Sequence, residues 1–253
     1  MRLAILSDIH GNLLALQAVL DDLKQAGGAD KTWVLGDLCA FGPRPAECLQ
    51  LVRDIPQVEV IGGNTERYVV MGQFPGFTGE TRPKDAEQWR AAPGQMLQSA
   101  ENIAWTMSKL SFADYEYLAK LHHRLEVEIP AYGWAIGYHA VPGDDETRLL
   151  PDTPVEEALD HFLDAEGRIG FGGHTHLPMD RDLGRWRVVN VGSVGLPRDE
   201  ARASYVVMTF EQGAPTVEFR RVAFDTEAIF ADLRQQGHPA ADFIAQSFAH
   251  KTL

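Results

Sequence analysis

Cysteine is scarce in this chain of 253 residues, which contains only Cys39 and Cys48. The two cysteines form no CxxC pair, so the sequence excludes a disulfide scaffold and a zinc ribbon, and buried free thiols are the simpler interpretation. A chain of this length buries roughly 70 to 75% of its unfolded surface and needs no disulfides for a full core. We therefore expect one globular domain over residues 1–253.

Long hydrophobic runs are also missing. No apolar stretch approaches 18 residues, and the N-terminal sequence MRLAILSDIHG reaches Asp8 after an apolar run far too short for the core of a signal peptide. The sequence therefore predicts no membrane association and a cytoplasmic location.

Positive charge is in deficit, because 23 lysines and arginines face 36 acidic residues and give a formal net charge of −13. A non-specific nucleic-acid binder needs basic patches that displace counterions from phosphates, so we expect no stable nucleic-acid binding. An anionic substrate must meet positive charge that is made locally. Bound divalent cations are the natural source of that charge.

Short apolar runs alternate with helical patterns along the chain. The runs that predict strands are 2–6, 32–35, 58–61, 132–138, 168–171 and 187–191. Helices are predicted over 13–23, 225–236 and 239–250, with a hairpin around Gly213 before the last two. Thr153 and Pro154 predict a further helix start, with Thr153 as the N-cap. The alternation predicts an α/β fold with parallel pairing.

Residues 72–126 interrupt this alternation. The segment begins rich in glycine, proline and polar residues, and Ser111 and Asp114 then have the spacing of a capping box. We interpret 72–126 as a helical insertion that could lie over a site, and the alternative is an extra helical pair that only enlarges the core. Within it, Phe74, Phe77 and Trp89 could stack on a base or pack within the loop.

Potential metal ligands follow the predicted strands, where the loops of an open α/β sheet converge. These residues are Asp8, His10, Asp37, Asn64, His139, His174 and His176. The set combines imidazole, carboxylate and amide groups without thiolate, which suits Mn, Fe, Zn, Co or Ni better than a calcium or iron–sulfur site. Each element alone is common by chance, and the order and spacing together carry the signal.

The ordered pattern is Asp8-Ile9-His10, Gly36-Asp37, Gly63-Asn64, His139 and Gly173-His174-Thr175-His176. This pattern resembles the calcineurin-like metallophosphoesterase family, in particular a compact bacterial branch with diadenosine tetraphosphatase-like and phosphodiesterase-like members. The resemblance covers most of residues 1–200. It implies a four-layer αββα sandwich and two divalent metal ions, with manganese as the leading candidate.

The resemblance also implies how the ligands divide between the two metals. One metal would take Asp8, His10, Asp37 and His176, and the other would take Asp37, Asn64, His139 and His174, so that Asp37 is the bridge. A hydroxide held between the metals would attack a phosphodiester or phosphoanhydride. We expect a small phosphorylated substrate, with dinucleoside polyphosphates as candidates.

The chain departs from the family pattern at Thr65, where most members carry a histidine that helps protonate the leaving oxygen. Threonine has no useful pKa near neutrality, so we expect a preference for phosphoanhydrides or activated aryl diesters over alkyl phosphates. Asp37, Asn64, Thr65 and Glu66 are the candidate catalytic residues. Glu66 could orient a ligand histidine or be a plain acid at a helix N-terminus.

Arg198 and Asn12 are the candidate substrate-binding residues. Arg198 could clamp a phosphate through its guanidinium group, or be a solvated arginine paired with Asp199. Asn12 could approach the site beside His10, or cap the first helix. His122 and His123 could reach a substrate, or lie favourably at a helix C-terminus.

Two alternative functions remain open from the sequence. A phosphomonoesterase or protein phosphatase is the enzymatic alternative. A non-catalytic scaffold with the same fold is the other, although a scaffold would tolerate missing ligands and all seven are present here.

Overall fold

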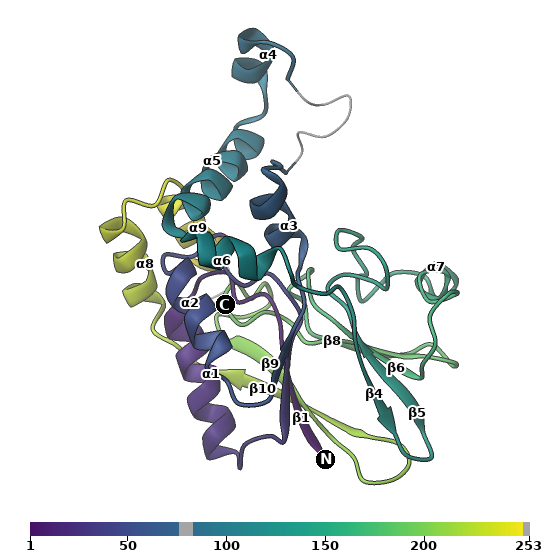
Figure 1. The fold of residues 1–253 in the computed structure, drawn as a ribbon. Coiled ribbons are helices and arrows are strands. Elements are labelled where there is room, and N and C mark those ends of the chain that lie inside the picture. Colours follow the sequence, from purple (N-terminus) through teal and green to yellow (C-terminus); the bar gives the residue numbers. More distant parts are fainter. Residues whose placement is uncertain (76–82, 250–253) are drawn as a thin grey trace.

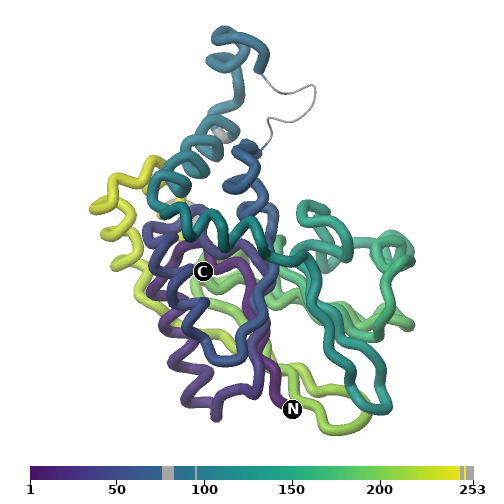
Figure 2. Tube along the Cα trace, viewed as in Figure 1, coloured from purple at the N-terminus to yellow at the C-terminus, as the bar shows by residue number. Residues whose placement is uncertain are grey.

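Two five-stranded sheets pack face to face in the computed structural model, which describes residues 1–75 and 83–249 (Figure 1). The first sheet has the order β10-β9-β1-β2-β3 and consists of β1 (Arg2–Leu6), β2 (Lys31–Val34), β3 (Val58–Val60), β9 (Ala203–Thr209) and β10 (Thr216–Val222). Strands β1, β2 and β3 are parallel, as predicted, and β9 and β10 form the predicted hairpin around Gly213. Figure 2 shows the N-terminal strand beside the distant β9.

The second sheet has the order β4-β5-β6-β8-β7. Its strands are β4 (Leu125–Ile129), β5 (Gly133–Gly137), β6 (Ile169–Gly172), β7 (Met179–Asp182) and β8 (Arg187–Asn190). The central strands β5, β6 and β8 are parallel, and the two edge strands are antiparallel to their neighbours. Edge strands β4 and β7 were not predicted, because β4 spans the end of the predicted insertion and β7 carries charged residues at three of its four positions.

Alternation along β1 shows how the layers form. Leu3 and Ile5 point into the core between the sheets, where they join Phe171 of β6. Ala4 and Leu6 point to the opposite face and join a second core that contains residues of α1 (Leu13–Gln25) and α2 (Pro45–Arg53). Because successive side chains of a strand alternate between faces, one short apolar run serves both interfaces.

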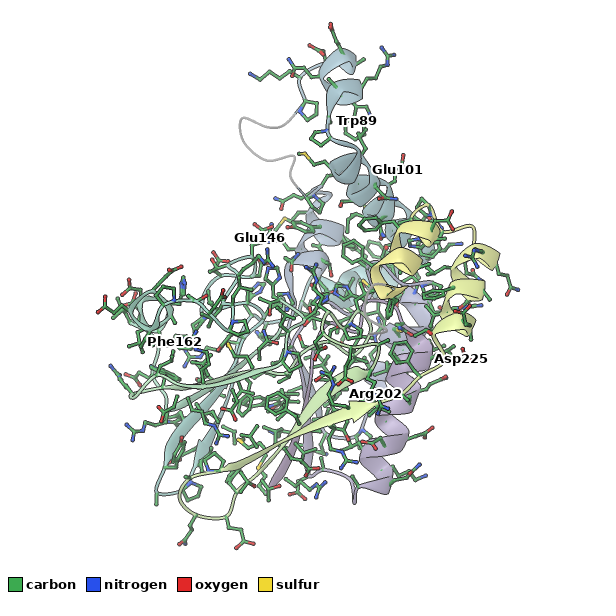
Figure 3. All side chains as sticks on the ribbon, turned by 180° about the vertical axis from the view of Figure 1, so that it is seen from behind. Trp89, Glu101, Glu146, Phe162, Arg202 and Asp225 are labelled. Carbon is green, nitrogen blue, oxygen red and sulfur yellow. The ribbon has the colours of Figure 1, made fainter. Side chains whose placement is uncertain are left out.

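A third apolar cluster covers the outer face of the second sheet. It joins Ile136 and Tyr138 to Ala158 of α7 (Val155–Asp160) and to Phe162, and Phe162 is labelled in Figure 3. Helices therefore flank both sheets, and the predicted four-layer αββα arrangement is confirmed. Helices α8 (Thr226–Gln235) and α9 (Ala241–Ala249) complete the chain beside the first layer.

The N-cap predicted at Thr153 is wrong by one position. Helix α7 begins after Pro154, and none of the described side chains caps it. The hydroxyl of Thr153 instead accepts the backbone N–H of Leu150 at 2.9 Å, so it is already engaged in the preceding turn. None of the helices in the described ranges is long and apolar enough to span a membrane.

The segment after α3 (Asn64–Met71) contains α4 (Ala86–Ala91), α5 (Gly94–Lys109) and α6 (Phe112–Leu118). The capping box of Ser111 and Asp114 is present, with Ser111 Oγ accepting the Asp114 N–H at 3.2 Å. Helix α4 and the adjoining end of α5 project away from the sheets (Figure 1). Ile103 of α5 and Leu118 of α6 are buried in the core of the first layer, so the base of this segment contributes to packing.

Candidate metal centre

The predicted ligands meet at the carboxyl ends of the parallel strands. They come from the loops after β1, β2, β5 and β6 and from the first residue of α3: Asp8, His10, Asp37, His139, His174, His176 and Asn64. The four loops and the helix start converge because parallel strands end at the same edge of each sheet. All these residues are buried except His174, which is half-buried.

The first ligand group is formed by Asp8, His10, Asp37 and His176, whose ligand atoms all lie within 4.8 Å of one another. His176 Nε2 lies 3.1 Å from Asp8 Oδ1 and 3.0 Å from His10 Nε2. His10 Nε2 lies 3.6 Å from Asp8 Oδ1 and 3.6 Å from Asp37 Oδ2. These atoms form a compact set of two carboxylates and two imidazoles.

The second group includes the other oxygen of Asp37. His139 Nε2 lies 3.5 Å from Asp37 Oδ1 and 3.0 Å from Asn64 Oδ1. His174 Nδ1 also lies 3.1 Å from Asn64 Oδ1. Asp37 therefore faces the first group with Oδ2 and the second group with Oδ1.

Each of the four histidines has its outer ring nitrogen against a backbone carbonyl. The four pairs are His10 Nδ1 with Ala40 O, His139 Nδ1 with Leu35 O, His174 Nε2 with Glu146 O and His176 Nδ1 with Leu196 O, at 2.6 to 3.0 Å. A carbonyl oxygen only accepts, so in the neutral ring the outer nitrogen carries the proton and the inner nitrogen presents a lone pair. Backbone partners of this kind fix the tautomer of metal-binding histidines.

The inner atoms fit a divalent cation. In the neutral rings, two Nε2 lone pairs, those of His10 and His176, face each other at 3.0 Å, and the buried Asp8 Oδ1 accepts no hydrogen bond from the residues that the structure describes. Such a set of acceptors repels itself unless positive charge lies between its members, and buried carboxylates are normally hydrogen-bonded, paired or bound to a metal. The mixture of imidazole, carboxylate and amide suits a transition metal.

Burial and charge shift the ligand pKa values in two directions. Burial lowers the pKa of His174 and of His176 below the ordinary histidine value. Burial also acts on His10, but Asp8 and Asp37 outweigh it and raise its pKa. The pKa of Asp8 is well below its usual range, because nearby histidines outweigh the effect of burial. The net direction of each shift is therefore set by the charges beside the ligand as well as by its burial.

The backbone of the ligand loops is strained. Positive φ angles occur at Asp8 (56°), His10 (50°), Asp37 (53°), His174 (64°) and His176 (61°). Residues other than glycine rarely adopt this left-handed conformation, and such residues cluster at functional sites, where the surrounding structure imposes it. Five of the eight non-glycine residues with positive φ in the described part of the chain are candidate ligands, which supports the interpretation of these loops as a functional site.

Two glycines allow the loops to approach. A Cβ on Gly63 would lie 2.4 Å from Asp37 Oδ1, and a Cβ on Gly173 would lie 2.2 Å from Asp8 Oδ2. Both distances are far below van der Waals contact, so only glycine fits at these positions.

Glu66 organises the loop that carries Asp37. Its carboxylate accepts the backbone N–H groups of Asp37 at 2.7 Å, of Leu38 at 2.8 Å and of Gly63 at 2.9 Å. Its hydrogen bonds among the described residues therefore go to backbone and neighbouring side chains rather than to a ligand histidine. Glu66 is an acid at the start of α3 that ties this helix to the loop after β2.

Thr65 also contacts Asp37. Its backbone N–H and its hydroxyl both donate to Asp37 Oδ1, at 3.0 and 2.8 Å. The residue is only 1% exposed. The hydroxyl therefore points at the shared carboxylate from within the protein.

The two candidate substrate-binding residues, Asn12 and Arg198, differ in their hydrogen bonds and ion pairs. Asn12 caps α1 by accepting the Ala15 N–H at 3.1 Å, and its amide group donates to Gly195 O at 2.9 Å. Arg198 is exposed, and Asp199, its partner in the alternative interpretation, pairs with Arg221 at 2.7 Å. Arg198 lines a cavity together with the ligand His176, and within residues 1–75 and 83–249 no ion pair holds its guanidinium.

Two cavities flank the centre. The first has a volume of about 450 Å³ and is lined by His176, Arg198 and residues that the sequence did not indicate, among them Phe41, Gln98, Asn102 and Phe243. The second, of about 670 Å³, is lined by His139, His123, Arg67, Asp144, Asp145 and Glu146. Glu146, labelled in Figure 3, lies between the second sheet and α3, where it pairs with Arg67.

The aromatic residues proposed for base stacking lie elsewhere. Phe74 packs against the core of the first layer, and Trp89 stands on the projecting α4 (Figure 3). Phe77 lies outside the described residues. Of the two phenylalanines that line the first cavity, the sequence could have indicated only Phe41, because Phe41 lies four residues after the ligand Asp37.

Residues 1–213 match the calcineurin-like phosphoesterase superfamily domain. The chain is 29% identical over 248 residues to MJ0912, an uncharacterized protein of Methanocaldococcus jannaschii, with 90% of each chain covered. It is also 28% identical over 106 residues to a symmetrical bis(5'-nucleosyl)-tetraphosphatase of Aromatoleum aromaticum, a match that covers 42% of this chain and 37% of that one.

Solved structures share the fold. A metallophosphoesterase from Sphaerobacter thermophilus aligns with a TM-score of 0.74 at 27% identity, covering 100% of this chain and 99% of that one. The hypothetical protein PH1004 from Pyrococcus horikoshii aligns with a TM-score of 0.78 at 22% identity, covering 97% and 96%.

The chain belongs to the calcineurin-like phosphoesterase superfamily. It is accordingly a metal-dependent phosphoester hydrolase that acts on small phosphorylated substrates, and its buried Asp/His cluster can hold a divalent metal ion. The family assignment made from the motifs is thereby confirmed, and the scaffold alternative is not supported.

Proposed function

We propose that this chain is a dinuclear metal hydrolase of phosphodiester or phosphoanhydride bonds. The observation that carries the proposal is Asp37, whose Oδ2 lies 3.6 Å from His10 Nε2 while its Oδ1 lies 3.5 Å from His139 Nε2. One carboxylate with an oxygen toward each of two ligand groups is suited to bridge two cations.

The ligands would divide as the two groups divide. Asp8, His10, Asp37 and His176 would hold one ion, and Asp37, Asn64, His139 and His174 the other. Manganese is our leading choice, and the same donors accept iron, zinc, nickel or cobalt. When bound, the ions would activate a water molecule near neutral pH and neutralise the phosphoryl oxygens.

Thr65 and Glu66 act on the position of Asp37. The Thr65 hydroxyl fixes Asp37 Oδ1, and the Glu66 carboxylate fixes the backbone N–H of the same residue. Thr65 is turned away from bulk solvent, so it is badly placed to give a proton to a leaving group. We therefore propose that good leaving groups, such as a nucleoside phosphate or an aryl alcohol, are preferred over alkyl alcohols.

The substrate would be a small nucleotide-like phosphate ester or anhydride. Similarity to a symmetrical bis(5'-nucleosyl)-tetraphosphatase supports dinucleoside polyphosphates as candidates. Arg198, exposed beside His176, is our candidate for binding a substrate phosphate. Asn12 would position the loop of His10 from behind, because both ends of its amide are engaged within the protein.

Hydrolysis of three substrates by the manganese-reconstituted protein tests the proposal. These are diadenosine tetraphosphate, bis-p-nitrophenyl phosphate and an alkyl phosphomonoester. We expect the anhydride and the aryl diester to be cleaved faster than the alkyl ester, and Asp37→Asn to lower kcat on the order of 10³-fold, since several kcal/mol of charge stabilisation are lost.

The matched control is Asp180→Asn, which removes a carboxylate that pairs with Arg187 on the second sheet and should leave kcat unchanged. Preferential cleavage of the alkyl monoester would favour the phosphomonoesterase alternative. Absence of hydrolysis with every one of the candidate metals would contradict the proposal.

A further inference from the structure

We propose that the 450 Å³ cavity beside His176 binds a nucleoside of the substrate, with its base against Phe243. This inference rests on the proposed function, because the phosphate that carries the nucleoside would be held at the metal ligands. The volume lies within the range of small-molecule sites, roughly 300 to 1,000 Å³.

The cavity adjoins the candidate metal centre. His176 of the first ligand group and the exposed Arg198 both line it. Helix α5 contributes Gln98 and Asn102, and α9 contributes Phe243. A phosphate at the metal ligands would therefore have its organic group directed toward a wall built by these two helices.

The walls suit an aromatic ring. Phe41, Leu196 and Phe243 are apolar, and Phe41 packs edge-on against the ring of His10 with 5.2 Å between the centroids. Phe243 is 48% exposed, so α9 holds a large aromatic side chain out of the core. Bases stack on exposed aromatic rings of this kind with little dependence on sequence.

Polar groups accompany the aromatic surface. Asn102 is 1% exposed and its Oδ1 accepts the Phe41 N–H at 3.1 Å, which makes its amide a rigid part of the wall. A few fixed polar groups within an apolar lining are typical of sites that orient a heterocyclic ligand.

Charge distinguishes this cavity from the 670 Å³ cavity on the other flank. The second cavity carries Asp144, Asp145 and Glu146, and its Arg67 is already bound to Asp145 at 2.8 Å. The first cavity instead carries the guanidinium of the exposed Arg198 and no acidic side chain among the described residues that line it. A phosphate-bearing nucleoside is repelled by acidic groups and attracted by arginine, so the first cavity is the favourable one.

Binding of adenosine 5'-monophosphate and of ribose 5-phosphate tests the inference. Both ligands carry the same phosphate, and only the first has a base. Isothermal titration of the manganese-loaded protein should give a Kd at least about tenfold lower for adenosine 5'-monophosphate, a difference of about 1.4 kcal/mol.

Variants at Phe243 should remove this difference. Phe243→Ala and the milder Phe243→Leu are expected to weaken adenosine 5'-monophosphate binding toward the affinity of ribose 5-phosphate and to leave ribose 5-phosphate binding unchanged. Phe112→Ala is the matched control, because Phe112 is a 74% exposed phenylalanine on α6 that does not line the cavity. Thermal unfolding of each variant checks the fold.

Equal affinities for the two ligands in the wild type, or an unchanged ratio in both Phe243 variants, would overturn the inference. Hydrolysis of bis-p-nitrophenyl phosphate by the same preparations separates the two proposals. If the protein hydrolyses this diester but binds the two ligands equally well, only the nucleoside site is contradicted. If it binds adenosine 5'-monophosphate more tightly but hydrolyses nothing with any candidate metal, the site is supported and the proposed function is contradicted.

Discussion

The metal centre and the helical wall beside it are built in opposite ways. Five ligands of the centre have left-handed backbone, and the buried ligand atoms crowd within a few ångströms. The wall formed by α5 and α9 has ordinary helical backbone and leaves Phe243 half exposed. Chemistry requires fixed geometry, whereas a surface for an organic group requires shape and apolar area. Changes at the centre should therefore affect turnover, and changes in the wall should affect affinity or stability.

After the loss of the Asp37 carboxylate itself, the largest effect is expected from Gly63→Ala at the centre. The new Cβ would lie 2.4 Å from Asp37 Oδ1 and must displace the carboxylate. We expect kcat to fall by roughly 100-fold or more, as for other misplaced catalytic groups. Steady-state hydrolysis of bis-p-nitrophenyl phosphate measures the effect.

Gly94→Ala is the control for this change. Gly94 begins α5 and a Cβ there would meet no atom within 4 Å, so kcat should stay within about twofold, because alanine suits a helix at least as well as glycine. Equal losses in the two variants would show that the centre is no more constrained than the helical wall.

A smaller effect is expected from Thr65→Val, which keeps the shape of the side chain and removes the hydroxyl that donates to Asp37 Oδ1 at 2.8 Å. Hydrogen bonds to charged groups contribute about 1.5 to 3 kcal/mol, so kcat should fall about tenfold or somewhat more. The ratio of anhydride to alkyl-ester turnover should not change. A selective loss of alkyl-ester turnover would instead indicate that Thr65 assists the leaving group.

Replacing His238 should have the smallest effect on turnover and should instead change how stability depends on pH. His238 packs against Trp105 of α5 with 4.4 Å between the ring centroids. Burial lowers the pKa of His238 to about 4. Its unfolded pKa is about 6.5, so the unfolded chain binds the proton more tightly. The contribution to stability is complete above pH 6.5 and is lost as the pH falls toward 4, by about 2 kcal/mol at pH 5.

Urea unfolding of the wild type and of His238→Asn at pH 7.5 and pH 5 measures this loss. The asparagine oxygen replaces Nδ1 as the acceptor for the Ala240 N–H, and the variant has no group that titrates there. We expect its free energy of unfolding to fall less than that of the wild type between the two pH values. An equal fall in both proteins would place the pH sensitivity elsewhere.

The two regions also differ in how well the sequence predicts them. Asp8, Asp37 and His174 each follow an apolar run, and strand ends are local features that a sequence displays. The alternation of apolar runs and helical patterns likewise predicted the parallel strands, whereas the four layers were implied by the family resemblance. The targets of Glu66 and Thr65 were not predicted, because the loop after β2 meets the start of α3 only after folding.

The helical wall was not predicted either, because its residues also meet only after folding. Phe41, Asn102 and Phe243 come from distant parts of the chain and share no motif, and only tertiary packing brings them to one cavity. Residues 72–126 were correctly expected to contain helices, but β4 begins at Leu125, inside the predicted insertion, because its pairing with β5 defines it as a strand.

The metal content of the wild type and of Asn64→Ala, measured by inductively coupled plasma mass spectrometry after manganese reconstitution, tests the central claim most directly. Asn64 Oδ1 belongs only to the second ligand group, with His139 and His174. A dinuclear centre bridged by Asp37 predicts about two ions per chain in the wild type and about one in the variant. A wild type that hydrolyses its substrate with a single bound ion, unchanged in Asn64→Ala, would contradict it.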